Sequence, residues 1–218
     1  MKIKTQSKKV NKAWVNNHVN DPYVKLAQKE GFRARAAYKL KEIDELFHLV
    51  KPGMRVVDLG STPGAWSQYV KRKMSEHEAP KDTVAKIIAL DLLPMENIEG
   101  VEFILGDFRE EECLKQLEAS LEGQKVQLVV SDMAPNLSGI SSTDAARVEL
   151  LIELALDFCS THLEPGGSLV AKVFHGPAYA GLVQKFKQQF KIVKTHKPKS
   201  SRSYSSETFL VGLGQLSN

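Results

Sequence analysis

Short apolar runs alternate along this chain with longer segments whose apolar residues recur every three or four positions. Runs of four to eight apolar residues between turn signals are typical of buried strands, and the three-to-four spacing is typical of amphipathic helices. This pattern predicts seven strands, at 54–59, 84–90, 101–105, 126–131, 168–174, 190–195 and 207–212. It predicts helices at 21–30, 34–50, 64–74, 108–122, 143–162 and 179–190.

The order of these elements predicts an α/β fold. Apolar strands separated by helices indicate a mostly parallel sheet with helices on both faces. A Lys/Ser-rich loop at 196–206 replaces the helix between the last two strands, which indicates a hairpin. We therefore expect a mostly parallel seven-stranded sheet with one antiparallel strand at its end.

Three helices carry more detailed signals. Asp21 is a suitable cap, with Pro22 at the first helical position. The helix at 34–50 is expected to end near the breaker pair Pro52-Gly53. The helix at 143–162 is expected to bury one stripe, made of Ala146, Leu150, Leu154 and Phe158.

Composition narrows the class of protein. With 218 residues, 42% hydrophobic and 26% charged, the chain suits one globular domain over 21–218, with a helical extension at 21–50 and a flexible basic arm at 1–20. No apolar run approaches the roughly 18–20 residues of a membrane helix, and the basic start lacks a secretory pattern. Cys113 and Cys159 fit no metal or redox spacing. We expect a cytoplasmic protein without a metal site.

Positive charge is concentrated in two segments. Residues 1–53 hold 12 Lys and Arg against 5 Asp and Glu, whereas the remainder holds 18 against 21. A second basic run, free of acids, contains Lys185, Lys187, Lys191, Lys194, Lys197, Lys199 and Arg202. This distribution indicates a polyanionic partner such as a nucleic acid, although solubilising surface charge would give the same pattern.

The first predicted strand runs into the sequence Asp58-Leu59-Gly60-Ser61-Thr62-Pro63-Gly64-Ala65-Trp66. A strand, a glycine turn and a helix place a ligand at the carboxyl edge of the sheet, near a helix N-terminus. The spacing is neither the G-x-G-x-x-G of dinucleotide sites nor a phosphate-binding P-loop. It resembles the first motif of class I S-adenosylmethionine methyltransferases. An ordinary strand-to-helix turn is the alternative.

Three further acids follow apolar strands. They are Asp91, Asp107 and Asp132, after the second, third and fourth predicted strands. Because the carboxyl ends of parallel strands meet at one edge, we expect these side chains to lie there together. Carboxylates can accept hydrogen bonds from ribose hydroxyls and an adenine amine, and they complement a sulfonium cation. One such acid is often only a helix cap, but three successive ones favour a cofactor site.

Lys172 lies within the apolar strand at 168–174. A lysine in a buried strand is costly unless it is paired or functional. Its position opposes Ala171 and Val173, so we expect its amine on the other face of the sheet, within reach of Asp132. A lysine extended toward solvent at the sheet edge is the alternative.

Taken together, these segments resemble the FtsJ/RrmJ (RlmE) family of ribosomal RNA 2'-O-ribose methyltransferases over roughly residues 20–213. The matching segments are Arg33–Leu40, Val57–Gly60 with Pro63-Gly64 and Trp66–Gln68, Ser131–Asn136, Ala171–Phe174, and Ser200–Arg202 leading to Glu207. Departures from the family pattern are Ser61, Thr62 and Ala65.

The resemblance implies a class I, Rossmann-like methyltransferase fold and S-adenosylmethionine as the cofactor. It places a catalytic tetrad on Lys39, Asp132, Lys172 and Glu207, and cofactor contacts on Gly60, Gly64, Trp66, Asp91, Asp107 and Asp132. It also implies a uridine 2'-hydroxyl in large-subunit (23S-type) ribosomal RNA as the target, within an assembled subunit, and a monomeric enzyme. RNA would then be held by Arg33, Arg35, Lys194, Lys197, Lys199 and Arg202.

Methyl transfer to a ribose hydroxyl needs that hydroxyl to lose its proton as the new bond forms. Lys172 is our candidate either to accept this proton or to orient the oxygen. Desolvation and Lys39 would favour a neutral amine, which could act as a base, whereas Asp132 and Glu207 would favour the charged form. Both roles remain open from the sequence.

Two alternatives remain open at this point. Methyltransferases that act on amines of bases or proteins often carry Asp/Asn-Pro-Pro-aromatic after the fourth strand, but this chain has Asp132-Met133-Ala134-Pro135. A catalytically inactive RNA-binding module of the same fold is the second alternative. Intact Lys172 and Asp132 argue against it.

Overall fold

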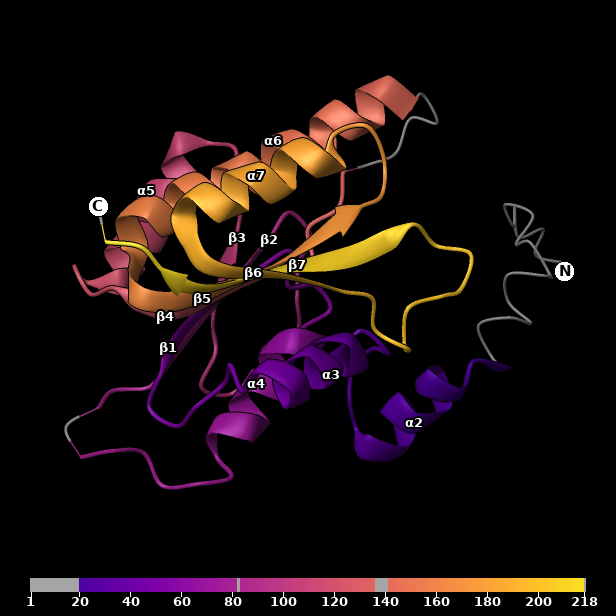
Figure 1. Ribbon diagram of the computed structural model, residues 1–218. Helices are drawn as coiled ribbons and strands as arrows, with labels where there is room; N and C mark the ends of the chain where they lie inside the picture. Colours follow the sequence, from indigo (N-terminus) through magenta and orange to yellow (C-terminus); the bar gives the residue numbers. More distant parts are fainter. Residues whose placement is uncertain (1–19, 82, 136–140, 218) are drawn as a thin grey trace, which may run out of the picture.

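The computed structural model describes residues 20–81, 83–135 and 141–217, and within these ranges a single twisted sheet lies between two layers of helices (Figure 1). The strands are β1 (Arg55–Leu59), β2 (Lys86–Asp91), β3 (Glu102–Leu105), β4 (Val126–Ser131), β5 (Leu163–Phe174), β6 (Phe190–His196) and β7 (Glu207–Gln215). The helices are α2 (Pro22–Glu30), α3 (Ala37–Phe47), α4 (Ala65–Met74), α5 (Glu111–Leu121), α6 (Ser141–His162) and α7 (Tyr179–Gln189). The predicted arm at 1–20 falls almost wholly outside the described residues.

The strand order is β3-β2-β1-β4-β5-β7-β6. Strands β1 to β5 pair in parallel, and β7 pairs antiparallel with both β5 and β6. The expected α/β sheet is confirmed, but the antiparallel strand β7 is not at the end of the sheet, since β6 forms that edge. The physical reason is burial. In β7 the residues 208–212 are all buried, whereas in β6 most are exposed, so the more apolar strand takes the interior position.

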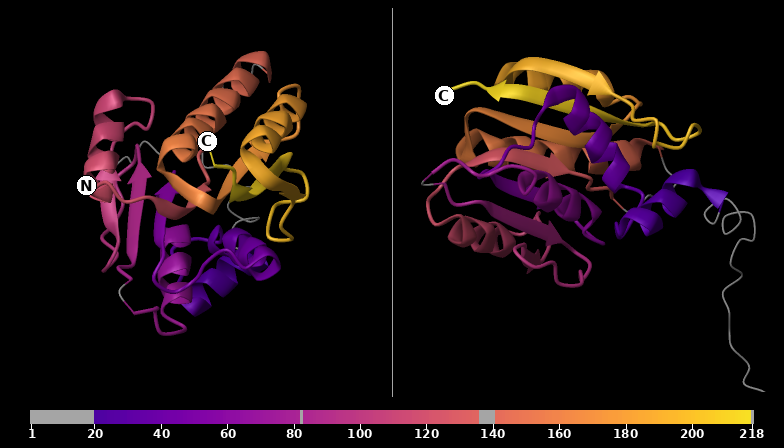
Figure 2. Two further views of the ribbon diagram at one scale, coloured as in Figure 1. Left: turned by 60° about the vertical axis from the view of Figure 1, so that its left-hand side comes forward. Right: turned by 90° about the horizontal axis from the view of Figure 1, so that it is seen from below.

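Helices α5, α6 and α7 cover one face of the sheet, and α3 and α4 cover the other (Figures 1 and 2). Two apolar clusters fill the space between these layers. Ala171 and Val173 of β5 belong to the cluster under α5–α7, whereas Val170 belongs to the cluster under α3 and α4. This alternation confirms that Lys172 faces away from Ala171 and Val173. Among the described residues, no helix is long and apolar enough to span a membrane.

The start of α2 and the end of α3 are fixed by two aspartates. Asp21 caps α2, accepting a hydrogen bond from the backbone N–H of Tyr23 at 2.9 Å, as the sequence predicts. The helix expected at 34–50 is shorter, because the buried carboxylate of Asp44 accepts hydrogen bonds from the N–H groups of Leu49 and Val50 at 2.7 and 2.8 Å. These bonds hold the chain in a turn immediately after α3 and so end the helix.

The buried stripe of α6 differs from the expected one. Ala146 and Leu150 are exposed, Leu154 is half-buried, and only Phe158 of the expected residues is buried. The core-facing residues follow a second stripe, Val148, Ile152, Ala155 and Cys159, and also include Leu156 and Phe158. Both stripes have helical spacing, and packing against β5 and α7 selects the second one. The start of β5 at Leu163 is also earlier than the expected residue 168.

Candidate active site

The loop between β1 and α4 passes close to the ends of two neighbouring strands. The N–H of Gly60 donates to the carbonyl of Leu90 at 2.8 Å. Gly60 has a φ of +76°, and a Cβ there would lie 2.8 Å from the backbone of Met133. Gly64 has a φ of +103° and stands immediately before the first turn of α4. The loop therefore needs glycine at both positions, and it points the N-terminus of α4 at the carboxyl edge of the sheet.

Asp91 fixes this loop to the end of β2. Its carboxylate accepts hydrogen bonds from the N–H groups of Thr62 and Leu93, both at 2.8 Å. The hydroxyl of Thr62 donates to the carbonyl of Leu93, also at 2.8 Å. Thr62, one of the departures from the family pattern, therefore joins the loop to the segment after β2 without disturbing it.

Asp107 and Asp132 also lie at the carboxyl edge, as the parallel topology predicts. Asp107 pairs with Arg109 at 2.6 Å, and hydrogen bonds from that guanidinium lower the pKa of the Asp107 carboxyl. Trp66 is placed differently. Its side chain is buried, donates to the carbonyl of Ala36 at 2.8 Å and packs on Phe209 with ring centres 5.8 Å apart. Its indole therefore joins α4 to the segment before α3.

Asp58 belongs to the motif but was absent from the predicted site residues. It is fully buried near the end of β1, and Ser67 Oγ donates to Asp58 Oδ2 at 2.6 Å. Burial raises the pKa of Asp58 to about 7, against the opposing effect of the Ser67 hydrogen bond. Among the described residues, Asp58 Oδ1 has no hydrogen-bond partner. An acid inside an otherwise apolar strand is the sequence signal that could have identified it.

Lys172 and Asp132 form the centre of the site. Lys172 Nζ lies 3.0 Å from Asp132 Oδ1 and donates to the main-chain carbonyl of Asp132 at 2.6 Å. The two residues stand at the ends of the adjacent parallel strands β5 and β4. The residue Lys172 as a whole is only 8% exposed, so its amine is held between protein groups with a small opening to the edge.

Lys39 and Glu207 form a second ion pair beside the first. Lys39 Nζ of α3 lies 2.7 Å from Glu207 Oε1, at the first residue of β7. Burial alone would raise the pKa of Glu207, but the charge and hydrogen bond of Lys39, with a contribution from Lys172, lower it below its usual range. The four residues assigned to the tetrad therefore come together as two ion pairs at one edge of the sheet.

The two predicted RNA-binding arginines are engaged within the protein. Arg33 donates to the carbonyls of Pro63, Glu96 and Asn97 at 2.6–3.0 Å, which ties the glycine loop to the segment after β2. Arg35 pairs with Asp21 and donates to the carbonyl of Ser200. Burial, and then the charge of Arg202, lower the pKa of Arg35. Both arginines therefore brace the walls of the site.

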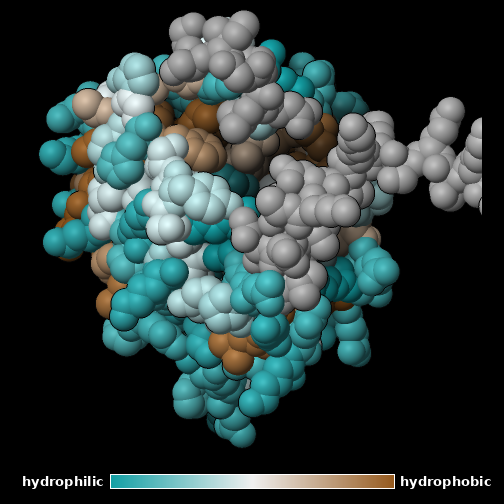
Figure 3. Space-filling model, turned by 90° about the vertical axis from the view of Figure 1, so that its right-hand side faces the viewer, coloured by the Kyte–Doolittle hydropathy of each residue, from teal (hydrophilic) through white to brown (hydrophobic). Residues whose placement is uncertain are grey.

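The four remaining basic residues of the prediction lie along β6 and the β6–β7 loop. Lys194, Lys197 and Lys199 are exposed, and Arg202 is half-buried. Lys197 Nζ donates to the carbonyl of Ser205, and the N–H of Lys199 donates to Glu42 of α3. The loop thus packs beside α3, close to the Lys39–Glu207 pair. Hydrophilic residues dominate the surface at this end of the molecule (Figure 3).

The residue types at this edge fit a sulfonium-bearing nucleoside. The carboxylates of Asp91 and Asp107 can accept hydrogen bonds from hydroxyl and amino groups, and the carboxylate of Asp132 complements a positive sulfur. The unpartnered Asp58 oxygen and the N-terminal turn of α4 offer further polar groups beside the glycine loop. Lys172 stands on the far side of Asp132 from β1, so a methyl donor and an acceptor oxygen can meet near it.

Comparison with known proteins agrees with this geometry. The FtsJ-like methyltransferase family matches residues 32–215. Proteins named ribosomal RNA large subunit methyltransferase E from Delftia acidovorans and Variovorax paradoxus are each 66% identical over 215 residues. These matches cover 98% of this chain and 99% and 97% of those proteins.

Solved structures share the fold. A crystal structure from Plasmodium falciparum, described as a ribosomal RNA methyltransferase, has a TM-score of 0.74 and 28% identity, covering 86% of this chain and 100% of that chain. Fibrillarin from Aeropyrum pernix, solved with natively bound S-adenosylmethionine, has a TM-score of 0.54 and 16% identity, covering 82% and 73%. The sheet, the glycine loop and the family match together show that this chain belongs to the FtsJ-like methyltransferase family and uses S-adenosylmethionine as its methyl donor.

Proposed function

We propose that this protein transfers the methyl group of S-adenosylmethionine to the 2'-hydroxyl of a uridine in large-subunit ribosomal RNA. The observation that carries the proposal is the assembly of two ion pairs, Lys172–Asp132 and Lys39–Glu207, beside the glycine loop. The names of the relatives support ribosomal RNA of the large subunit as the substrate. We further propose that the assembled subunit is the substrate, that the enzyme is monomeric and that it acts in the cytoplasm.

The cofactor side is formed by the ends of β1 to β4. We assign Gly60 and Gly64 to the close approach of the loop, and Asp91, Asp107 and Asp132 to polar contacts with the cofactor. For Trp66 the buried indole supports a packing role, with any cofactor contact made by its backbone N–H at the start of α4. When bound, the cofactor supplies an electrophilic methyl group on a positively charged sulfur.

For Lys172, the surroundings support an orienting role rather than that of a base. Its amine lies 3.0 Å from one carboxylate, and the carboxylate of Glu207 is close enough for Lys172 to lower its pKa. The Lys172 amine already donates to the carbonyl of Asp132, and we assign it a second hydrogen bond, to the ribose oxygen, which orients and stabilises that oxygen as its proton is lost to solvent. Alignment of the oxygen, methyl and sulfur then supplies much of the rate.

Basic residues around the edge supply affinity for RNA phosphates. Lys194, Lys197 and Lys199 are exposed and lie on the acceptor side of the site. Arg33 and Arg35 were predicted to share this task, but their guanidinium groups already donate to protein acceptors, so we assign their main role to holding the site walls. Phosphate contacts of this kind give salt-dependent affinity and little sequence preference.

The test is a transfer assay with a radiolabelled methyl donor on large ribosomal subunits and, in parallel, on free ribosomal RNA. A 2'-O-methyl group makes the adjoining backbone bond resistant to alkali, so the modified position can be mapped after hydrolysis. We expect label and an alkali-resistant site on a uridine, with subunits preferred. Label without alkali resistance would indicate methylation of a base. No incorporation into either substrate would indicate a binding module.

A further inference from the structure

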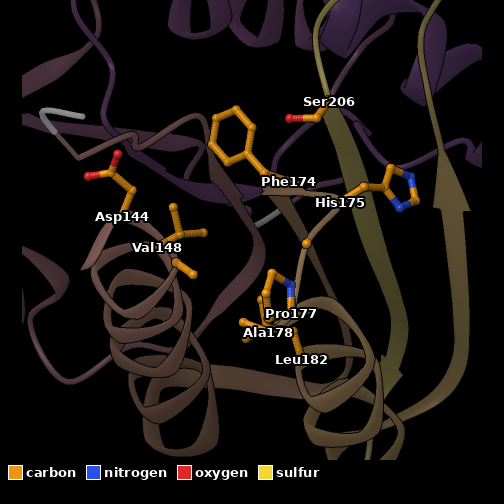
Figure 4. A pocket seen from close by; sticks show the side chains of 10 residues that line it. Asp144, Val148, Phe174, His175, Pro177, Ala178, Leu182 and Ser206 are labelled. Carbon is orange, nitrogen blue, oxygen red and sulfur yellow. The ribbon is translucent and has the colours of Figure 1, made fainter. Parts of the chain in front are cut away.

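A cavity opens at the acceptor end of the sheet, outside the tetrad itself (Figure 4). Its volume is about 220 Å³, several times the roughly 30 Å³ that one water molecule occupies in the liquid. It lies between the N-terminal part of α6 and the turn from β5 into α7. Its walls include Asp144, Val148, Phe174, Pro177, Leu182 and Ser206.

The cavity is connected to the tetrad through strand pairing. Phe174 follows Lys172 by two residues, a distance of about 7 Å along a strand. In the antiparallel pairing of β5 with β7, Phe174 lies opposite Glu207, and the N–H of His175 donates to the carbonyl of Ser206 at 3.0 Å. The tetrad lies on the α3–α4 face of the sheet and the cavity on the α6–α7 face, but both open at the same carboxyl edge. A nucleotide whose ribose lies against Lys172 would therefore reach the cavity with its base across the end of β5.

The walls have the character of a site for a planar, partly polar ring. Phe174 is half-buried and presents its ring to the cavity, with Asp144 and Val148 on one side and Ser206 on the other (Figure 4). Phe174, Val148 and Leu182 supply apolar surface, whereas Asp144 and Ser206 add a carboxylate and a hydroxyl. The His175 imidazole points away from the cavity and packs against Tyr179 in a tilted arrangement, with ring centres 4.5 Å apart. The cofactor does not account for this cavity, since the glycine loop, Asp91 and Asp107 lie on the β1–β3 side of the sheet.

We propose that this cavity receives the base of the acceptor nucleotide, stacked on Phe174, with the Asp144 carboxylate accepting an N–H from the base. The inference rests on the proposed function and adds the residues that select the nucleotide. Uracil presents an N–H between two carbonyls on its pairing edge, whereas cytosine presents an acceptor nitrogen at the same position. A carboxylate at this point favours uracil and disfavours cytosine.

The first experiment measures kcat, KM for unmethylated large ribosomal subunits, and the Kd for S-adenosylhomocysteine. We compare Phe174→Leu, which removes the aromatic ring, with Ala178→Phe, which fills the cavity without removing a contact. Each variant is expected to raise KM between about 5-fold and 100-fold, the range for loss of one base–aromatic stack, without changing the Kd of S-adenosylhomocysteine. Leu150→Ala is the matched control, because Leu150 is 46% exposed on α6 outside the cavity.

The second experiment uses large subunits assembled from transcripts with uridine or cytidine at the methylated position. Asp144→Asn is expected to reduce the preference for uridine by at least about 5-fold, because an amide can both donate and accept. Unchanged KM in both Phe174→Leu and Ala178→Phe, with unchanged base preference in Asp144→Asn, would overturn the inference while leaving the proposed function intact. A wild-type enzyme that methylates no ribosomal RNA would overturn both. Thermal unfolding of each variant separates lost binding from lost folding.

Discussion

The two halves of the carboxyl edge are built in different ways. On the cofactor half, main-chain N–H groups of the neighbouring loops hold Asp91 in place, and Arg33 braces the same loops through main-chain carbonyls. On the acceptor half, side chains hold one another as ion pairs, and Lys39 and Glu207 come from opposite ends of the chain. Backbone contacts fix a shape, whereas ion pairs hold charged groups that an incoming substrate can engage. Binding of the methyl donor and activation of the acceptor should therefore be separable by mutation.

Substitution of Lys172 is expected to give the largest difference between the effect on catalysis and the effect on cofactor binding. Lys172→Met keeps much of the side-chain volume and removes the charge that lies 3.0 Å from Asp132. We expect kcat to fall by about 100-fold to 1,000-fold, the range for loss of one hydrogen-bond donor to a developing oxyanion, with little change in the Kd of S-adenosylhomocysteine. Single-turnover methylation and titration calorimetry measure the two quantities. A variant that folds normally and keeps its wild-type kcat would refute a catalytic role for this amine.

Substitution of Asp91 is expected to do the converse and weaken cofactor binding more than RNA binding. Asp91→Ala removes the acceptor of two main-chain hydrogen bonds and so loosens the glycine loop. Loss of hydrogen bonds to a charged group should raise the Kd of S-adenosylmethionine by about 10-fold to 100-fold, while KM for RNA changes little. The comparison between the halves would fail if this variant weakened RNA binding more than cofactor binding.

Asp58 provides a pH-dependent test of the cofactor half. Because the folded protein has a raised Asp58 pKa of about 7, it binds this proton more tightly than the unfolded chain does. Its stabilising effect is therefore complete below pH 4 and is lost as the pH rises toward and through 7. Between about pH 5 and pH 7.5 the wild type should lose about 2 kcal/mol of unfolding free energy that Asp58→Asn retains. Urea denaturation at the two pH values measures the unfolding free energy of each protein. Equal losses of unfolding free energy in the wild type and in Asp58→Asn would contradict a buried Asp58 with a raised pKa.

The smallest expected effect distinguishes an exposed basic residue, Lys194, from one that is held by protein acceptors, Arg33. Lys194 is exposed, so Lys194→Ala should weaken RNA binding a few-fold and lower the slope of log affinity against log salt by about 0.7–0.9. Arg33→Ala should leave that slope unchanged and lower the thermal stability, because Arg33 donates to main-chain carbonyls. Filter binding across a salt series and thermal unfolding give both quantities. A lower slope of log affinity against log salt in Arg33→Ala would indicate that Arg33 contacts RNA phosphates after all.

The sequence predicted the parts of the site that depend on local patterns. Each of Asp91, Asp107 and Asp132 follows an apolar run, and parallel strands bring such ends together. The alternation of side chains along a strand likewise placed Lys172 opposite Ala171 and Val173. The roles of Lys39 and Glu207, by contrast, came from resemblance to a family, because no local pattern links residues so far apart in the chain.

The sequence by itself determined the strands, the helices and the row of acids at one edge, because these follow from periodicity over a few residues. The tertiary structure alone decided that β7 lies between β5 and β6 in the sheet. It also decided that α6 buries Val148 and Ile152 rather than Ala146 and Leu150, and that Arg33 braces a loop. These outcomes were settled by competition between alternative partners for burial and for hydrogen bonds. Such a competition depends on residues that are distant in sequence, so no window along the chain contains its result.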